Sequence, residues 1–165
     1  MRTPRNATFT RRARRSVIAL ALLAVCPLFL AAPAAGVDFG LRGGVYTDQS
    51  DPFAGVELLA QIGSSRWYFN PNAEYVFVEN GDLVTANADV HYDFVVGEPV
   101  YIWAGAGLAL IFRDRPPRRD DTDAGVNLLA GVGFKPRGSS VRPYIQGKLI
   151  LADETEGVIA FGIRF

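Results

Sequence analysis

His91 is the only histidine of this 165-residue chain, and two carboxylates flank it, those of Asp89 and Asp93. In an extended strand these three residues share one face, with neighbours about 7 Å apart. If Glu57 or Glu74 approached from another strand, the group could bind a divalent cation. We favour the alternative, in which these groups pair with basic side chains inside the protein, because buried charges need partners. We therefore predict no metal and no cofactor. The predicted set of paired internal charges is Arg42, Glu57, Glu74, Asp89, His91, Asp93, Lys148 and Arg164.

Nucleophilic catalysis finds little support in the sequence. The only cysteine, Cys26, lies in an N-terminal segment that we expect to be removed, which excludes thiol chemistry and disulfides in the rest of the chain. Ser50 follows the first predicted strand, whereas His91 lies toward the opposite end of the fourth, so strand geometry separates this hydroxyl from the imidazole. We expect no enzymatic activity.

Residues 1–34 have the three parts of a secretory signal peptide. They contain six arginines and no acid, with a basic stretch over 1–15, an apolar run over 17–30, and small residues that permit cleavage after Ala34. A membrane anchor would need about 20 apolar residues without the interruptions at Pro27 and Pro33. The whole chain balances 17 Lys+Arg against 17 Asp+Glu, which argues against a nucleic-acid partner. We expect export, with residues 35–165 as the mature domain.

The mature segment alternates apolar and polar residues, the signature of β-strands. Connections rich in Gly, Pro, Ser, Asp or Asn separate the alternating runs. Most runs have the length that a tilted strand needs to cross a bilayer, about 9–11 residues. Pro71 cannot donate a ladder hydrogen bond, so we expect a bulge or a break there. The predicted strands are 37–46, 54–62, 67–78, 83–94, 100–112, 124–134, 141–151 and 157–165.

Alternation alone does not decide which face is inside. A soluble barrel keeps its apolar face inward, whereas a membrane barrel turns it outward to lipid. Here the polar face is rich in glycine and small polar residues, which suits a narrow eight-stranded interior with some room for water. Aromatic residues cluster near strand ends, as in the two girdles of a membrane barrel. The periplasmic ends would carry Phe39, Trp67, Phe69, Tyr92, Phe94, Tyr101, Trp103, Phe134, Tyr144 and Phe165; the outer ends would carry Tyr46, Phe53, Tyr75, Phe77 and Phe112. Tyr101, Trp103 and Tyr144 could instead point inward, because the strand 100–112 is apolar on both faces.

If the N-terminus starts in the periplasm, the segment 113–123 becomes an outer loop. Its guanidinium groups match the geometry of phosphate and could contact lipopolysaccharide. We favour the alternative of a solvated loop, because four aspartates in this segment neutralise its arginines. The candidate lipopolysaccharide contacts are Arg113, Arg115, Arg118 and Arg119.

The end of the chain, residues 157–165, alternates apolar positions and finishes on Phe165. It resembles the C-terminal assembly signal of bacterial outer-membrane barrels. Residues 104–108, 127–134 and 143–147 are similar to strand motifs of the opacity-protein and OmpA-like barrel families, and the resemblance covers 35–165. It implies insertion by the barrel assembly machinery, which would recognise Phe161, Ile163 and Phe165.

Together these observations predict an all-β fold, an eight-stranded antiparallel up-and-down transmembrane barrel preceded by a signal peptide. We expect a monomer in the outer membrane of a Gram-negative-type bacterium, with a structural or surface-interaction role. Its partners would be outer-membrane lipid and lipopolysaccharide. A narrow pore or a barrel acting on lipid A is the alternative within membranes. A soluble secreted barrel that binds an apolar ligand is the alternative outside them.

Overall fold

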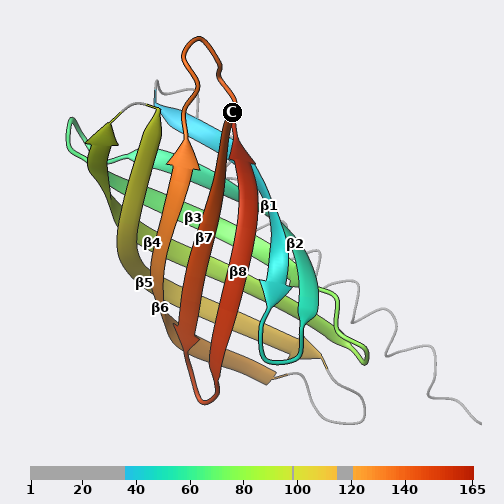
Figure 1. Cartoon of the computed structure of the whole chain (residues 1–165). Helices are drawn as coiled ribbons and strands as arrows, with labels where there is room; N and C mark the ends of the chain where they lie inside the picture. Colours follow the sequence, from blue (N-terminus) through green and yellow to red (C-terminus); the bar gives the residue numbers. More distant parts are fainter. Residues whose placement is uncertain (1–35, 98, 115–120) are drawn as a thin grey trace, which may run out of the picture. The chain divides into compact units, whose positions relative to one another are not determined.

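The protein forms one closed barrel of eight antiparallel strands (Figure 1). The computed structural model describes residues 36–97, 99–114 and 121–165, with only the backbone of 95–97. Each strand pairs with its neighbours in sequence, and β1 pairs with β8, so the sheet has no free edge. The predicted fold is confirmed. The strands are β1 (Val37–Tyr46), β2 (Asp51–Gln61), β3 (Trp67–Val76), β4 (Asp82–Gly97), β5 (Val100–Asp114), β6 (Asp121–Phe134), β7 (Arg142–Leu151) and β8 (Thr155–Arg164).

The observed strands are longer than predicted where the polar ends of hairpins stay paired. The β4–β5 ladder runs from Asp82↔Asp114 to Val95↔Tyr101, with an irregularity before Gly97. Alternating hydropathy marks only the part of a strand that has one apolar face, whereas backbone pairing continues past it. The ranges predicted for the fourth, fifth and sixth strands were therefore too short.

β3 runs continuously through Pro71 without a bulge, but its pairing with β2 is interrupted there. On the β4 side the register is continuous through Pro71↔Ala88. On the β2 side pairing stops after Glu57↔Asn72 and resumes at Ala60↔Phe69 in the same register. The amide of Asn70 donates to the carbonyl oxygen of Leu58 at 2.6 Å, beside the proline that cannot donate. This side-chain bond satisfies the carbonyl at the interruption.

We expect Asn70→Ala to lower the free energy of unfolding by about 1–3 kcal/mol, because it leaves the buried Leu58 carbonyl without its donor. The amide also donates to Glu57 Oε2 at 3.1 Å, and that bond would be lost as well. Urea unfolding of the barrel in lipid vesicles would measure the change. Asn70→Asp keeps the shape but removes both donors and places a carboxylate beside Glu57, so its loss should exceed that of Asn70→Ala. If Asn70→Ala left stability unchanged, the amide would not support the interruption.

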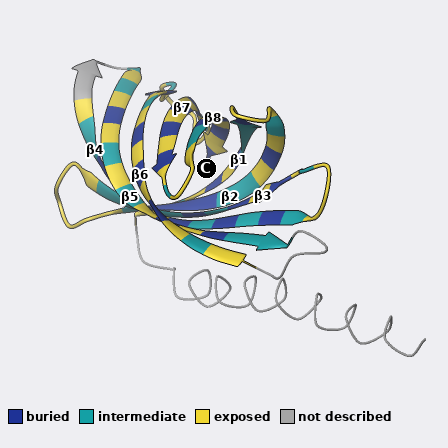
Figure 2. Cartoon of the chain, turned by 90° about the horizontal axis from the view of Figure 1, so that it is seen from below, coloured by how far each residue is buried: buried dark blue, intermediate teal, exposed yellow. Residues whose placement is uncertain are grey.

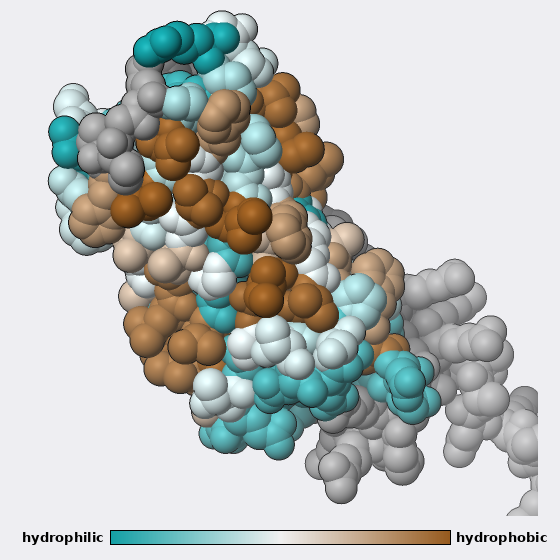
Figure 3. Space-filling view, in the orientation of Figure 1, coloured by the Kyte–Doolittle hydropathy of each residue, from teal (hydrophilic) through white to brown (hydrophobic). Residues whose placement is uncertain are grey.

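Burial alternates along the strands in the sense expected for a membrane barrel (Figure 2). In β4, Thr85, Asn87, Asp89 and His91 are buried in the lumen, while the residues between them face outward. The outward face forms a broad apolar band (Figure 3). Among the described residues, no helix has the length and apolar character to cross a membrane. Large apolar side chains on the exposed face include Leu41, Ile102, Leu108, Leu110, Val126, Leu128, Val132, Ile145, Leu149, Ile159 and Ile163.

Candidate functional site

A chain of five buried charges crosses the middle of the lumen. Arg164 Nε donates to Glu57 Oε1 at 2.8 Å, and Arg42 Nη1 lies 3.5 Å from Glu57 Oε2. Arg42 Nη2 lies 3.2 Å from Glu74 Oε1, which also accepts from Lys148 Nζ at 3.0 Å. All five side chains are essentially inaccessible to solvent. Buried charges of this kind are stabilised only when each has a partner, and here each one has.

Glycines on intervening strands let these charges meet. Gly55 stands in register between Arg42 and Glu74, and Gly40 stands between Glu57 and Arg164. A Cβ atom on Gly40 would lie 2.7 Å from Glu57 Cγ, so a larger residue would displace the carboxylate. Because these inward glycines have no side chain, charged side chains on the two flanking strands can reach each other across the strand between them. Their predicted role of making room in a narrow interior is correct, but ion pairs occupy that room.

Asp89 belongs to the predicted charge set, but amide groups hold it. Asn72 Nδ2 donates to Asp89 Oδ2 and Asn127 Nδ2 donates to Asp89 Oδ1, both at 2.8 Å. Asn87 links the two amides, since it donates to Asn72 Oδ1 at 3.0 Å and accepts from Asn127 at 2.9 Å. Asp89 meets Asn127 across Gly107, the register partner of both residues. The fully buried carboxylates of Glu57, Glu74 and Asp89 thus match in number the three cations of the charge chain.

His91 and Asp93 form a separate pair nearer the end where both barrel termini lie. His91 Nε2 is 3.4 Å from Asp93 Oδ1, and the imidazole lies between the rings of Tyr68 and Trp103, with centroids 5.7 and 5.8 Å away. Of the three residues considered for a cation site, His91 and Asp93 therefore pair with each other, whereas Asp89 binds amide groups. Across 36–97, 99–114 and 121–165, no group of three or more His, Cys, Asp or Glu side chains could hold a metal ion.

A cluster of aromatic rings packs inside the lumen beside the charge chain. Trp103, Tyr144 and Leu129 form a buried cluster with Tyr101 against it, and the Arg164 guanidinium lies over Trp103 at 5.1 Å and over Tyr144 at 4.3 Å. Each ring covers the glycine opposite it on a neighbouring strand, so the space that we had assigned to water is filled with rings. The pairs are Tyr101 with Gly133, Trp103 with Gly131, and Tyr144 with Gly162.

A layer of buried apolar side chains lies in the half of the lumen toward the rim opposite the barrel termini, and it was not predicted from the sequence. Tyr46 joins it to the charge chain, because its hydroxyl donates to Glu74 Oε2 at 2.5 Å. The only sequence signal was a few aliphatic residues on positions that alternate inward. The layer comprises Tyr46, Phe53, Val76, Leu83, Ala109, Ile111, Ile150, Val158 and Ala160.

Five aromatics placed at strand ends point inward; that direction was left open for Tyr101, Trp103 and Tyr144, and it was not expected for Tyr46 and Phe53. Tyr46, Phe53, Trp103 and Tyr144 are at most 4% exposed. Their rings pack in the two buried clusters of the lumen, because burying a large apolar surface is more favourable than exposing it at a strand end. The outward aromatics still gather near the two ends of the barrel, and they include Phe39, Trp67, Phe94, Phe134 and Phe165 at one end and Tyr75 and Phe77 at the other.

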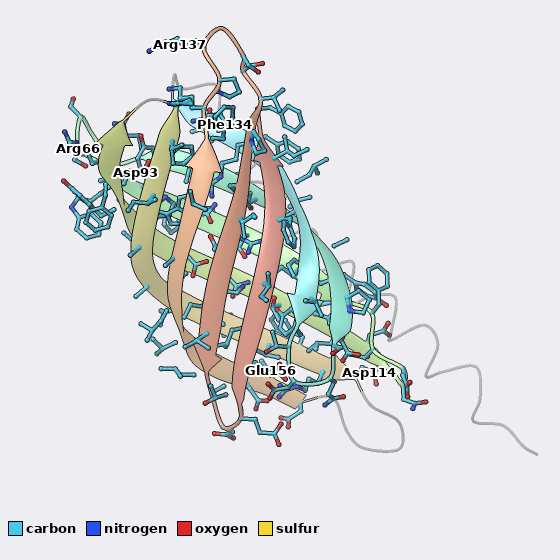
Figure 4. All side chains as sticks on the ribbon, in the orientation of Figure 1. Arg66, Asp93, Asp114, Phe134, Arg137 and Glu156 are labelled. Carbon is cyan, nitrogen blue, oxygen red and sulfur yellow. The ribbon has the colours of Figure 1, made fainter. Side chains whose placement is uncertain are left out.

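The two rims of the barrel differ in charge (Figure 4). We call the rim that carries Gly36 and Phe165 the terminal rim, and the opposite one the far rim. The terminal rim includes Arg66, Lys135, Arg137 and Arg142, of which Arg142 pairs with Asp38. The described part of the far rim carries mostly acids, namely Asp48, Asp51, Glu79, Asp82, Asp114, Asp121, Asp123, Asp153, Glu154 and Glu156.

The far rim contains one described member of the predicted arginine contacts. Arg113 pairs with Asp123, as the hypothesis of a self-neutralising loop requires. Arg115, Arg118 and Arg119 lie outside the described residues.

The residues of the predicted assembly signal all face outward on the last strand. Phe161, Ile163 and Phe165 are 56%, 42% and 49% exposed. Phe165 N donates to the carbonyl oxygen of Phe39 at 2.8 Å, so the chain end is tied to β1 at the barrel closure. These outward side chains are accessible to another molecule. The predicted signal peptide, residues 1–34, lies outside the described residues.

No protein-family model and no curated protein sequence matches the chain. Solved structures match its fold. The N-terminal β-barrel domain of Pseudomonas aeruginosa OprF has a TM-score of 0.63 at 14% identity, over 78% of this chain and 95% of that one. Neisserial surface protein A gives 0.58 at 16% identity, over 78% and 94%. Yersinia pestis Ail, the attachment invasion locus protein, gives 0.54 at 15% identity, over 78% and 96%.

A further structural neighbour is described as an enzyme. The outer-membrane enzyme PagL matches with a TM-score of 0.53 at 15% identity, over 78% of this chain and 98% of PagL. At these identities the likeness establishes the fold, that of the eight-stranded outer-membrane barrels. Because the same fold can carry catalysis or lack it, the activity of this chain depends on its own side chains.

Proposed function

We propose that this chain is an integral outer-membrane barrel of a Gram-negative-type bacterium, with a sealed lumen and a structural or surface-interaction role. The observation that carries the proposal is the inverted burial: charges and amides are paired inside, and aliphatic side chains cover the outside. Exposed apolar surface on this scale requires a lipid environment. A soluble barrel with an apolar interior for a ligand does not fit, because ion pairs and packed rings fill the lumen.

The proposed route and orientation begin with export by residues 1–34 and cleavage near Ala34. Both barrel termini would then face the periplasm, and the acidic far rim would face outward. Loop length does not support this orientation, since the longest described turn, residues 135–141, lies on the terminal rim. The outward Phe161, Ile163 and Phe165 are proposed contacts of the barrel assembly machinery.

We propose no catalytic activity for the barrel. His91 contacts Tyr68, Trp103 and Asp93 near the terminal rim, whereas Ser50 lies in the turn at the far rim. A general base must come within hydrogen-bond reach of its nucleophile, so this serine and histidine do not form a dyad. Arg115, Arg118 and Arg119 remain proposed contacts for lipopolysaccharide phosphates, with Arg113 engaged by Asp123.

Heat-modifiability tests the membrane barrel. We expect the protein in outer-membrane fractions to migrate differently on SDS gels before and after boiling, because a closed barrel resists detergent until heated. Purified barrel in planar bilayers should show no conductance above the lipid-only level, because the lumen is filled. A soluble periplasmic protein without a mobility shift would contradict the membrane assignment, and steady conductance would contradict the sealed lumen.

A further inference from the structure

A shallow apolar groove of about 670 Å³ lies on the lipid-facing wall, toward the terminal rim. It spans β6, β7, β8 and β1, and Gly43 contributes to its floor. Its outward walls are aliphatic and aromatic, as expected for contact with hydrocarbon rather than with water. The groove is lined by Leu41, Val132, Phe134, Ile145, Phe161 and Ile163, among others.

Basic residues stand at the terminal end of this groove. The turn 135–141 starts directly after Phe134 and carries Lys135 and Arg137 but no acid. The backbone amide of Lys135 donates to the carbonyl oxygen of Pro99 at 2.7 Å, which holds the turn beside Val100, another lining residue. Figure 4 shows Arg137 and Phe134 at the same end of the barrel.

A second hollow on the same wall lacks this charge. It measures about 510 Å³, lies on β6, β7 and β8 nearer the far rim, and is lined by Leu128, Leu149 and Gly147. In both hollows the only cation of the lining is buried in the charge chain, Arg42 in the first and Lys148 in the second. They differ because the basic turn 135–141 directly follows Phe134 of the first lining. Of these two hollows, the first therefore has basic residues beside its terminal end and the second does not.

We propose that the groove and the turn 135–141 bind one anionic diacylphospholipid of the inner leaflet, with an acyl chain in the groove and the headgroup phosphate at Lys135 and Arg137. This inference rests on the orientation proposed above, which places the terminal rim at the periplasmic headgroups. Apolar contact favours the chain, and each cation near an anionic membrane surface adds electrostatic attraction. The occupant is identified by that charge complementarity.

Native mass spectrometry of the refolded barrel in detergent micelles tests the proposal. Phosphatidylglycerol and phosphatidylethanolamine with the same acyl chains would be added at equal concentration. We expect one phosphatidylglycerol to bind in preference, and the preference to fall roughly five- to thirtyfold in the Lys135→Gln/Arg137→Gln variant. Arg66→Gln, on the same rim in the β2–β3 turn, is the control and should retain the preference.

A second pair of variants tests the groove itself. Val132→Trp places an indole ring in the groove and should reduce the binding of both lipids. Val126→Trp is the control: it lies on the same strand and the same face but outside the groove, and it should leave binding unchanged. Equal binding of the two lipids, or an equal loss with Arg66→Gln or Val126→Trp, would overturn the site. Each variant is first checked for its mobility shift on boiling, so loss of the barrel is distinguished from loss of the lipid.

Discussion

Glu74→Gln should destabilise the barrel by about 3–5 kcal/mol, the cost of leaving a buried charge without its partner. The Glu74 carboxylate binds Lys148 at 3.0 Å and Arg42 at 3.2 Å, and it accepts the Tyr46 hydroxyl. A glutamine of the same shape keeps the packing but removes the negative charge. Lys148 would then have no carboxylate, and Arg42 would retain only Glu57 at 3.5 Å.

Urea unfolding in lipid vesicles, followed by tryptophan fluorescence, would measure this loss. The double variant Glu74→Gln/Lys148→Met should recover most of the stability, because it removes the stranded cation together with its former partner. Asp82→Asn is the control; it weakens the exposed Tyr75–Asp82 hydrogen bond and should change stability by no more than about 0.5 kcal/mol. A loss below about 1 kcal/mol in Glu74→Gln would contradict the role of the charge chain.

The alternation of residues indicates which side chains face the lumen, but the pairing of the lumen charges depends on register. Seven of the eight titratable residues named from the sequence, all but Asp93, are buried, because side chains alternate strictly between faces. The contact between Asp89 and Asn127 joins β4 to β6 across Gly107, and only the combined register of two hairpins brings these residues into one row. Hydropathy contains no information about that register.

The direction of the aromatics at strand ends was left partly open for a related reason. Trp103 and Tyr144 lie near strand ends, where a girdle residue and a lumen residue look alike in sequence. What distinguishes them is the glycine opposite each ring, and a glycine partner can be identified only when the neighbouring strand is aligned. At Pro71 the local rule holds on one side only: pairing with β2 is interrupted, the Asn70 side chain donates to the Leu58 carbonyl there, and pairing with β4 continues.

Trp103→Ala should lower the free energy of unfolding by about 3–5 kcal/mol, as expected for truncating a large buried aromatic side chain. The indole is 2% exposed and contacts the rings of Tyr101, Tyr144 and His91. Its loss also removes one aromatic face from the Arg164 guanidinium. Trp67→Ala is the control at an outward position that is 47% exposed, and its loss should be clearly smaller.

The glycine opposite the indole makes this prediction sharper. A Cβ atom at Gly131 would lie 2.2 Å from the Trp103 ring, so Gly131→Ala alone should cost about 1–3 kcal/mol by overpacking. In the Trp103→Ala background the ring is absent, and only the contact with the Ile145 carbonyl at 2.8 Å would still oppose the new methyl group. The two changes should therefore couple in a double-mutant cycle, with a smaller combined loss than the sum. Strict additivity would mean that the ring does not rest on the glycine, and that the terminal half of the lumen is packed in some other way.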